Sequence, residues 1–104
     1  MPKFLFVYHG GNAPSTPEEG AKVMAQWQSW FGGMGAAVVD GGNPVLDSMT
    51  VSSSGVVADG GPNPVSGYSV VTANDYAAAC EMARGCPMVA DGSGSVEVAQ
   101  IHEM

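Results

Sequence analysis

The segment FLFVYH, residues 4–9, constrains the fold more than any other part of the chain. In a β-strand, alternate side chains point to opposite faces, so the three aromatic rings share one face while Leu5 and Val7 share the other. Both faces are apolar, which is typical of a strand covered on both sides. Because the run is shorter than the ~7–15 residues of a signal-peptide core and the ~20 of a spanning helix, we expect a strand of a cytoplasmic protein.

A long helix is predicted over residues 17–32. Thr16 suits the N-cap, Pro17 suits the first helical position, and Glu19 closes a capping box. The glycine-rich sequence GGMG predicts the end of the helix. Apolar residues recur at the spacing of one buried helical face, namely Val23, Met24, Trp27, Trp30, Phe31 and Met34.

A second helix is predicted over residues 76–84, a segment that contains four alanines. Asn74 or Asp75 caps its start, and Gly85 followed by Pro87 marks its end. The segment 88–94 reads as a loop. Apolar runs between turn clusters predict further strands at 36–39, 67–73 and 96–101, with a weak hairpin around 49–51 and 56–58.

This order of elements predicts the α+β class: a ferredoxin-like βαββαβ domain spanning residues 1–104, with an antiparallel sheet and two helices on one face. Two helices cover only one face of a four-stranded sheet. The strand at 4–9 is nevertheless apolar on both faces, so the uncovered face needs a partner. We expect that partner to be a second copy of the chain, which gives a homodimer joined through the sheet face.

The charge composition excludes several classes of partner. Only Lys3, Lys22 and Arg84 are basic, against ten acidic residues, and the formal net charge is −7. Nucleic acids and anionic membranes need several cations to neutralise phosphates, so neither is expected as a partner. No P-loop sequence is present, and the glycine cluster at 32–35 follows a helix instead of opening one. We therefore expect no cofactor and, if a ligand binds, a neutral or aromatic small molecule.

The candidate catalytic residues are His9, Asp40 and Asp59. His9 ends the first strand beside two glycines, where a neutral imidazole suits a general base near pH 7. Asp40 and Asp59 each precede a glycine-rich turn, and either carboxylate would orient the imidazole. The plainer interpretations are a local hydrogen bond for His9 and Asx turns for the aspartates.

The candidate ligand-binding residues are Trp27, Trp30 and Tyr68. A helical stripe of aromatic residues suits a pocket for a small aromatic molecule, but the same stripe is also typical of core packing. Tyr68 opens a strand after the proline-rich turn, where it either donates a phenolic proton or packs. No metal-ligand spacing is present, so no metal site is expected. Cys80 and Cys86 match no zinc or redox motif and are expected to be reduced.

Four segments together resemble the YCII-related (DGPF) family: FLFVYHGG, W..W...MG..VVDGGNP, DGGPNPVSGY.VV.A.D...A...A..CP and G.VEV..I.EM. The resemblance spans nearly the whole chain and implies a dimeric α/β barrel of ferredoxin-like subunits. In some members a His and Asp pair has been proposed as catalytic, and one branch of the family is associated with dehydrochlorination of a chlorinated aromatic. Those members carry the His on the first helix, so the resemblance does not carry the pair over intact to this chain. Two departures stand out: the helix over 17–32 contains no His, and the signature at 59–63 has an added Gly and lacks the Phe.

The sequence thus predicts a YCII-like protein that uses a His/Asp pair for proton transfer, as a small-molecule lyase or isomerase. The alternative is a non-catalytic module that binds a small ligand or only dimerises. Both hypotheses place the chain in a homodimer.

Overall fold

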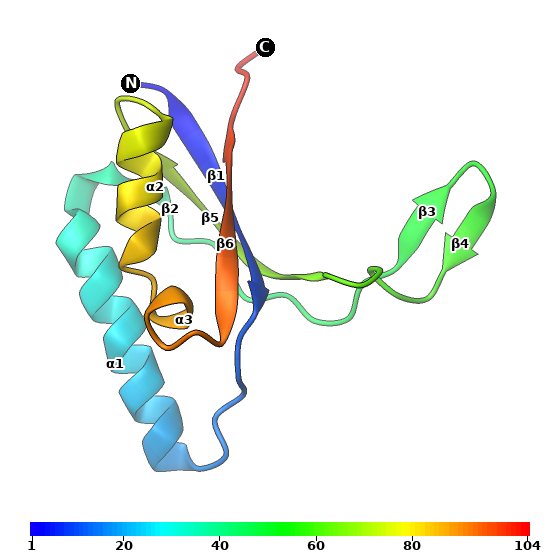
Figure 1. The fold of residues 1–104 in the computed structure, drawn as a ribbon, viewed down its shortest axis with the longest axis horizontal. Helices are drawn as coiled ribbons and strands as arrows, with labels where there is room; N and C mark the ends of the chain where they lie inside the picture. The colour runs from blue at the N-terminus through cyan, green and yellow to red at the C-terminus, as the bar shows by residue number, and fades with distance from the viewer.

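The computed structural model describes residues 1–104 and contains one four-stranded antiparallel sheet with the strand order β2-β5-β1-β6 (Figure 1). This order, with β1 and β5 in the middle, is that of the predicted ferredoxin-like fold. A separate two-stranded sheet joins β3 to β4. The elements are β1 (Lys3–Gly10), α1 (Pro17–Met34), a 3₁₀ turn (Gly35–Ala37), β2 (Val38–Asp40), β3 (Thr50–Ser52), β4 (Gly55–Val57), β5 (Val65–Thr72), α2 (Tyr76–Arg84), α3 (Pro87–Ala90) and β6 (Gly94–Gln100).

The two faces of β1 meet different surroundings. Phe4, Phe6 and Tyr8 are buried beneath the helices, whereas Leu5 and Val7 on the other face are only half-buried. Figure 1 shows all three helices on one side of the four-stranded sheet. We call the side without helices the open face. Strand β1 is therefore apolar on both faces, but the helices cover only one of them.

Helix α1 begins as predicted but ends later. The Thr16 hydroxyl accepts a hydrogen bond from the backbone N–H of Glu19 at 3.1 Å, while the Glu19 carboxylate binds Ser15 instead of closing the box on Thr16. The helix continues through Gly32 and Gly33, which were expected to stop it, and ends at Met34, where Gly35 caps it with a positive φ of 56°. Packing of Phe31 and Met34 on either side of the glycine pair offsets the low helix propensity of glycine.

Two other boundaries differ from the prediction. The strand expected at 36–39 starts at Val38, because residues 35–37 form a 3₁₀ turn. The expected loop at 88–94 contains the one-turn helix α3, which starts at Pro87 and buries Met88. Proline is favoured at the first position of a helix because its missing N–H has no partner there.

The core lies between the sheet and the helices, and α1 contributes only partly buried side chains to it. Trp30 joins α1 to α2 by a hydrogen bond, because its indole N–H donates to the carbonyl oxygen of Met82 at 3.0 Å. Gly85 makes room for this ring, since a Cβ at that position would lie 3.1 Å from Cδ1 of Trp30. The core residues with least exposure are Phe4, Phe6, Tyr8, Val71, Ala73, Ala79, Ala83, Cys86 and Met88.

The predicted hairpin is present as β3 and β4, and it stands away from the rest of the molecule. We call residues 45–64 the arm. Figure 1 shows the arm reaching out on the side of the sheet opposite the helices. The radius of gyration is 14.8 Å, against about 13 Å for a compact chain of this length. No helix of the structure is long and apolar enough to cross a membrane.

Prediction on α1. Replacing Trp30 by Phe removes the hydrogen bond to Met82 and keeps an aromatic ring. Trp27 is a matched control, since it packs on the same core from the same helix but its indole makes no hydrogen bond. We expect W30F to lower the free energy of unfolding by about 1 kcal/mol more than W27F, as measured by urea denaturation. Equal losses in the two variants would show that the hydrogen bond contributes nothing.

Candidate functional site

His9 lies near the end of β1, on the open face. Its side chain is 11% exposed, and its backbone pairs with Ser95 of β6 and Val65 of β5. The register with β5 shifts between Tyr8 and His9. Tyr8 pairs with Gly67 and His9 pairs with Val65, so Ser66 of β5 is the extra residue and β5 is the strand that bends. The residues just before β5, at the root of the arm, lie beside the imidazole.

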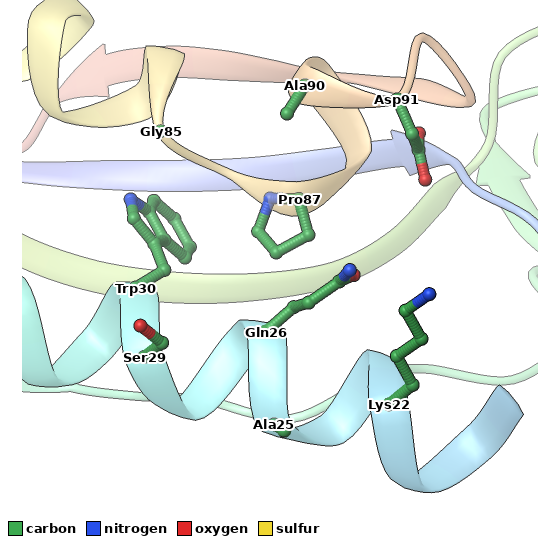
Figure 2. A pocket seen from close by; sticks show the side chains of 9 residues that line it. All are labelled: Lys22, Ala25, Gln26, Ser29, Trp30, Gly85, Pro87, Ala90 and Asp91. Carbon is green, nitrogen blue, oxygen red and sulfur yellow. The ribbon is translucent and has the colours of Figure 1, made fainter. Parts of the chain in front are cut away.

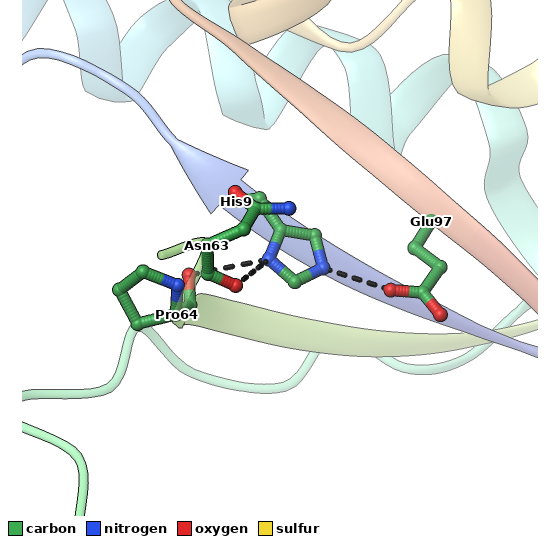
Figure 3. Close-up of polar contacts among 4 residues, drawn as sticks. All are labelled: His9, Asn63, Pro64 and Glu97. Atoms are coloured by element: carbon green, nitrogen blue, oxygen red, sulfur yellow. Dashed lines mark hydrogen bonds and ion pairs between the residues drawn. The ribbon is translucent and has the colours of Figure 1, made fainter. Parts of the chain in front are cut away.

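Both ring nitrogens of His9 face oxygen atoms (Figure 3). Nδ1 lies 3.1 Å from the carbonyl oxygen of Asn63 and 3.2 Å from that of Pro64, and Nε2 lies 2.9 Å from Oε1 of Glu97. A carbonyl only accepts, so Nδ1 carries a hydrogen, and an ionised Glu97 accepts a second hydrogen from Nε2. The surroundings thus favour the doubly protonated, cationic ring over the neutral base predicted from sequence.

The pKa of His9 is raised above its ordinary value of 6.5. The main cause is the hydrogen bond to the Glu97 carboxylate, which favours the charged ring. The carbonyls of Pro64 and Asn63 act in the same direction, while partial burial acts against them. The Glu97 side chain is 66% exposed, so water screens its charge and the pair stays accessible to a small molecule.

The register of β1 and β6 explains why Glu97 is the partner. Val7 pairs with Glu97 and His9 pairs with Ser95, so His9 and Glu97 are diagonal neighbours on the open face. Long side chains reach each other across such a diagonal. Sequence reasoning missed Glu97, although the alternation in Val96-Glu97-Val98 was a usable signal, because it places the carboxylate opposite the two core-facing valines.

Asp40 and Asp59 are occupied in turns. Asp40 Oδ1 accepts from the backbone N–H of Gly42 at 2.8 Å, and Asp59 Oδ1 accepts from that of Gly61 at 3.0 Å. No hydrogen bond or ion pair joins His9 to either carboxylate, so the expected pairing is replaced by the pairing with Glu97. The reason is local: an aspartate that precedes glycine by one or two residues closes an Asx turn on its own backbone.

Tyr68 shares the open face with the His9–Glu97 pair. It pairs with Val7 from the β5 side, and Val7 pairs with Glu97 from the β6 side. The three residues therefore form one row across the sheet. The Tyr68 hydroxyl accepts a long bond of 3.4 Å from the Asn43 amide, and its own hydrogen has no recorded acceptor, which leaves it available to a ligand.

Trp27 and Trp30 belong to α1 and pack against the core on the other side of the sheet. The ring of Trp27 packs edge-on against Tyr8 with centroids 5.0 Å apart. Tyr8 donates to Ser69 at 2.7 Å, and burial raises the pKa of Tyr8 to about 12. Trp30 also borders a shallow hollow of about 670 Å³ between α1 and the α2–α3 turn (Figure 2), whose charged residues are Lys22 and Asp91. The sheet thus separates both tryptophans from His9.

The remaining chemistry is sparse. No group of three or more His, Cys, Asp or Glu side chains is placed to hold a metal ion. Both cysteines are free thiols, Cys80 exposed and Cys86 buried. Lys3 pairs with Glu103 at 3.3 Å, and Arg84 pairs with Glu81 at 3.1 Å. Each of these cations therefore pairs with a carboxylate other than Glu97.

Comparisons with known proteins support the fold. No protein-family model matches the chain, and no curated protein matches it in sequence. Among solved structures, the chain is similar to 5-chloro-2-hydroxyhydroquinone dehydrochlorinase from Burkholderia phenoliruptrix, whose structure is a complex with 2,5-dihydroxybenzoquinone. The TM-score is 0.58 at 13% sequence identity, over 96% of this chain and 95% of that one. The likeness therefore shows a shared ferredoxin-like architecture along the whole chain.

Prediction on the charge of His9. Glu97 is the main cause of the raised pKa, so Glu97→Gln should bring the pKa of His9 back toward 6.5. An NMR pH titration of the imidazole C–H resonances, assigned with the H102Q variant, measures this shift. Glu103→Gln is the control, because that carboxylate pairs with Lys3 and not with His9. An unchanged titration of His9 in E97Q would contradict the assigned pair.

Prediction on pH and stability. The folded pKa of His9 is raised, so its stabilising contribution is complete below pH 6.5 and is lost as the pH rises through the folded pKa. Wild-type protein should therefore lose more unfolding free energy than His9→Gln between pH 6 and a pH above that pKa. His102→Gln should follow the wild type. Urea denaturation at both pH values checks this, and equal losses in all three proteins would rule the contribution out.

Proposed function

We propose that this chain is a YCII-like homodimer that binds a small neutral or aromatic molecule against the open face and transfers a proton with His9. Glu97 takes the part that the sequence assigned to Asp40 or Asp59. The reaction class that fits is a lyase or an isomerase. One observation carries the proposal: an imidazole held by three oxygen atoms forms an ion pair with an exposed carboxylate, on a face of the sheet with no helical cover.

The proton moves at Nε2 of His9. In the resting state this atom carries a hydrogen donated to Glu97, so the ring enters the reaction as an acid. Transfer of that proton to a substrate atom leaves a neutral ring with the hydrogen still on Nδ1, held there by the backbone carbonyls of Asn63 and Pro64. The neutral Nε2 then takes a proton from another substrate atom. In an isomerase, the two transfers move a hydrogen from one substrate atom to another. In a lyase, the first proton leaves with the leaving group and the second comes from the neighbouring substrate atom.

The surroundings support a ligand without strong negative charge. The row that contains Tyr68, Val7 and Glu97 offers a phenol, an apolar side chain and a carboxylate. Such a mixture suits a hydroxylated ring, which makes both apolar and hydrogen-bonding contacts. No ion pair brings a lysine or arginine to this row to clamp an anion.

The uncovered face supports the proposed homodimer. Leu5, Val7 and Val70 lie half-buried on the open face, with no second layer above them. A second copy placed face to face covers these three side chains in both subunits at once, in the arrangement that the family resemblance implies. His9, Glu97 and Tyr68 then lie between two sheets, where water is restricted.

A non-catalytic role is favoured by one observation. All the hydrogen-bonding capacity of the His9 ring is used within the protein, as expected of a residue that fastens the arm to the sheet. In that case the dimer binds a ligand without transforming it, or only assembles.

Prediction on ligand binding. With hydroquinone and related uncharged hydroxylated rings as probes, wild-type protein should bind and shift the NMR resonances of His9 and Tyr68. His9→Gln and Tyr68→Phe should each weaken binding several-fold in calorimetry, because each loses a polar contact with the ring. His102→Gln is the control and should bind as the wild type does. Binding that is indifferent to both variants, or no binding by any member of the set, would contradict the proposed site.

The same samples separate the two roles. A proton-transfer enzyme exchanges carbon-bound hydrogen of a bound substrate with D₂O, whereas a binding module does not. Proton NMR of the ligand over time measures that exchange. We expect it to depend on His9, and binding without His9-dependent exchange would favour the non-catalytic role.

A further inference from the structure

The arm, residues 45–64, is the most exposed part of the molecule. Every residue from 49 to 65 is exposed. Its large apolar side chains stand in solvent, with Leu46 at 92% and Val51 at 76% exposed. A free-standing two-stranded hairpin is marginally stable in water. Because no other part of the chain covers these apolar side chains, we expect another molecule to cover them.

The arm is nevertheless firmly placed. At its root, the Val45 N–H donates to the Ser66 carbonyl at 3.0 Å, and Pro44 bridges to Gly67 of β5. Within the arm, the Thr50 hydroxyl donates to the Asp59 carbonyl at 2.7 Å. These bonds tie the arm to the end of the sheet in a defined direction, so its exposed side chains form a preformed surface and not a random loop.

One face of the hairpin is mainly apolar. Val51 and Val56 are directly opposite each other in the β3–β4 register, so they share a face, and alternation places Met49 on the same side. The arm carries no lysine or arginine, and its acidic residues are Asp47 and Asp59. Both aspartates lie outside the paired strands. The chemistry of this face therefore selects an uncharged, apolar counterpart.

The amount of exposed surface fits a protein partner. The chain exposes 6838 Å², whereas a compact monomer of its mass of 10.6 kDa exposes about 5,500 Å². The difference, about 1,300 Å², exceeds the ~800 Å² that each partner of a stable complex buries. The direction of the arm identifies the partner, since the arm extends on the open-face side (Figure 1), beside any second copy that covers that face.

We infer that the arm packs against a second copy of this chain, with Met49, Val51 and Val56 at the contact. The inference rests on the proposed face-to-face homodimer and extends it to the arm. It also links the dimer to the site, because the carbonyls of Asn63 and Pro64 at the root of the arm hold Nδ1 of His9. Seating the arm on the partner fixes those carbonyls, and so the dimer helps to orient the imidazole.

The test is the dimer dissociation constant of the full chain, measured by sedimentation equilibrium. The variant Val51→Asp with Val56→Asp places two carboxylates in the inferred contact and should weaken the dimer by more than about tenfold. Met24→Asp is the matched control: Met24 is 59% exposed and Val56 is 60% exposed, but Met24 lies on α1. It should leave the dissociation constant unchanged.

Hydrogen exchange keeps the inference testable if the double variant misfolds. The amides of β3 and β4 should exchange at least several-fold more slowly in concentrated wild-type dimer than after dilution below the dissociation constant. If the double variant has the same dimer dissociation constant as the wild type, or if the arm amides show no protection in the wild-type dimer, the inference is overturned while the dimer itself stands. A wild-type protein that stays monomeric at high concentration overturns both.

Discussion

The architecture depends on one constraint: a four-stranded sheet with helices on a single side. Phe4, Phe6 and Tyr8 find their cover beneath α1, α2 and α3, whereas Leu5 and Val7 from the same strand find none within the chain. The features that bear on the proposed function lie on that uncovered side. The ion pair, the row of Tyr68 and Glu97, and the direction of the arm all belong to the open face. A monomer would leave this surface to water, and the low content of charged residues, 12%, gives it little solubilising capacity.

His9 connects three segments that are distant in sequence. It is part of β1, its Nε2 binds β6 through Glu97, and its Nδ1 binds the root of the arm through Asn63 and Pro64. In the proposed function, the same three contacts of the imidazole serve both structure and chemistry. The carbonyls fix which nitrogen keeps its hydrogen, and the carboxylate raises the pKa of the ring. Fixing the tautomer and stabilising the charged ring are the two conditions that an acid–base histidine needs.

Much of the fold could be predicted from local signals. Thr16 caps α1 as expected, and Asp75 is the one of the two candidate residues that caps α2. The alternation in β1 predicted that the three aromatic residues share a face, and the structure shows that this is the face beneath the helices. The site was harder, because its partners meet through strand register. His9 and Glu97 are 88 residues apart and become neighbours only once β1 pairs with β6. Glycine next to Asp40 and Asp59 was the signal that these carboxylates belong to turns. Trp27 and Trp30 pack against the core, which is the simpler of the two interpretations that the helical stripe allowed.

The central claim is that a second copy covers the open face and encloses the His9–Glu97 pair. The most direct measurement is an isotope-filtered NOE experiment on a mixture of labelled and unlabelled chains, which reports only contacts between subunits. The account predicts contacts between chains from the methyl groups of Leu5, Val7 and Val70. A spectrum with no such contacts at these methyls, or with contacts confined to Met24 and Val89 on the helical side, would contradict it.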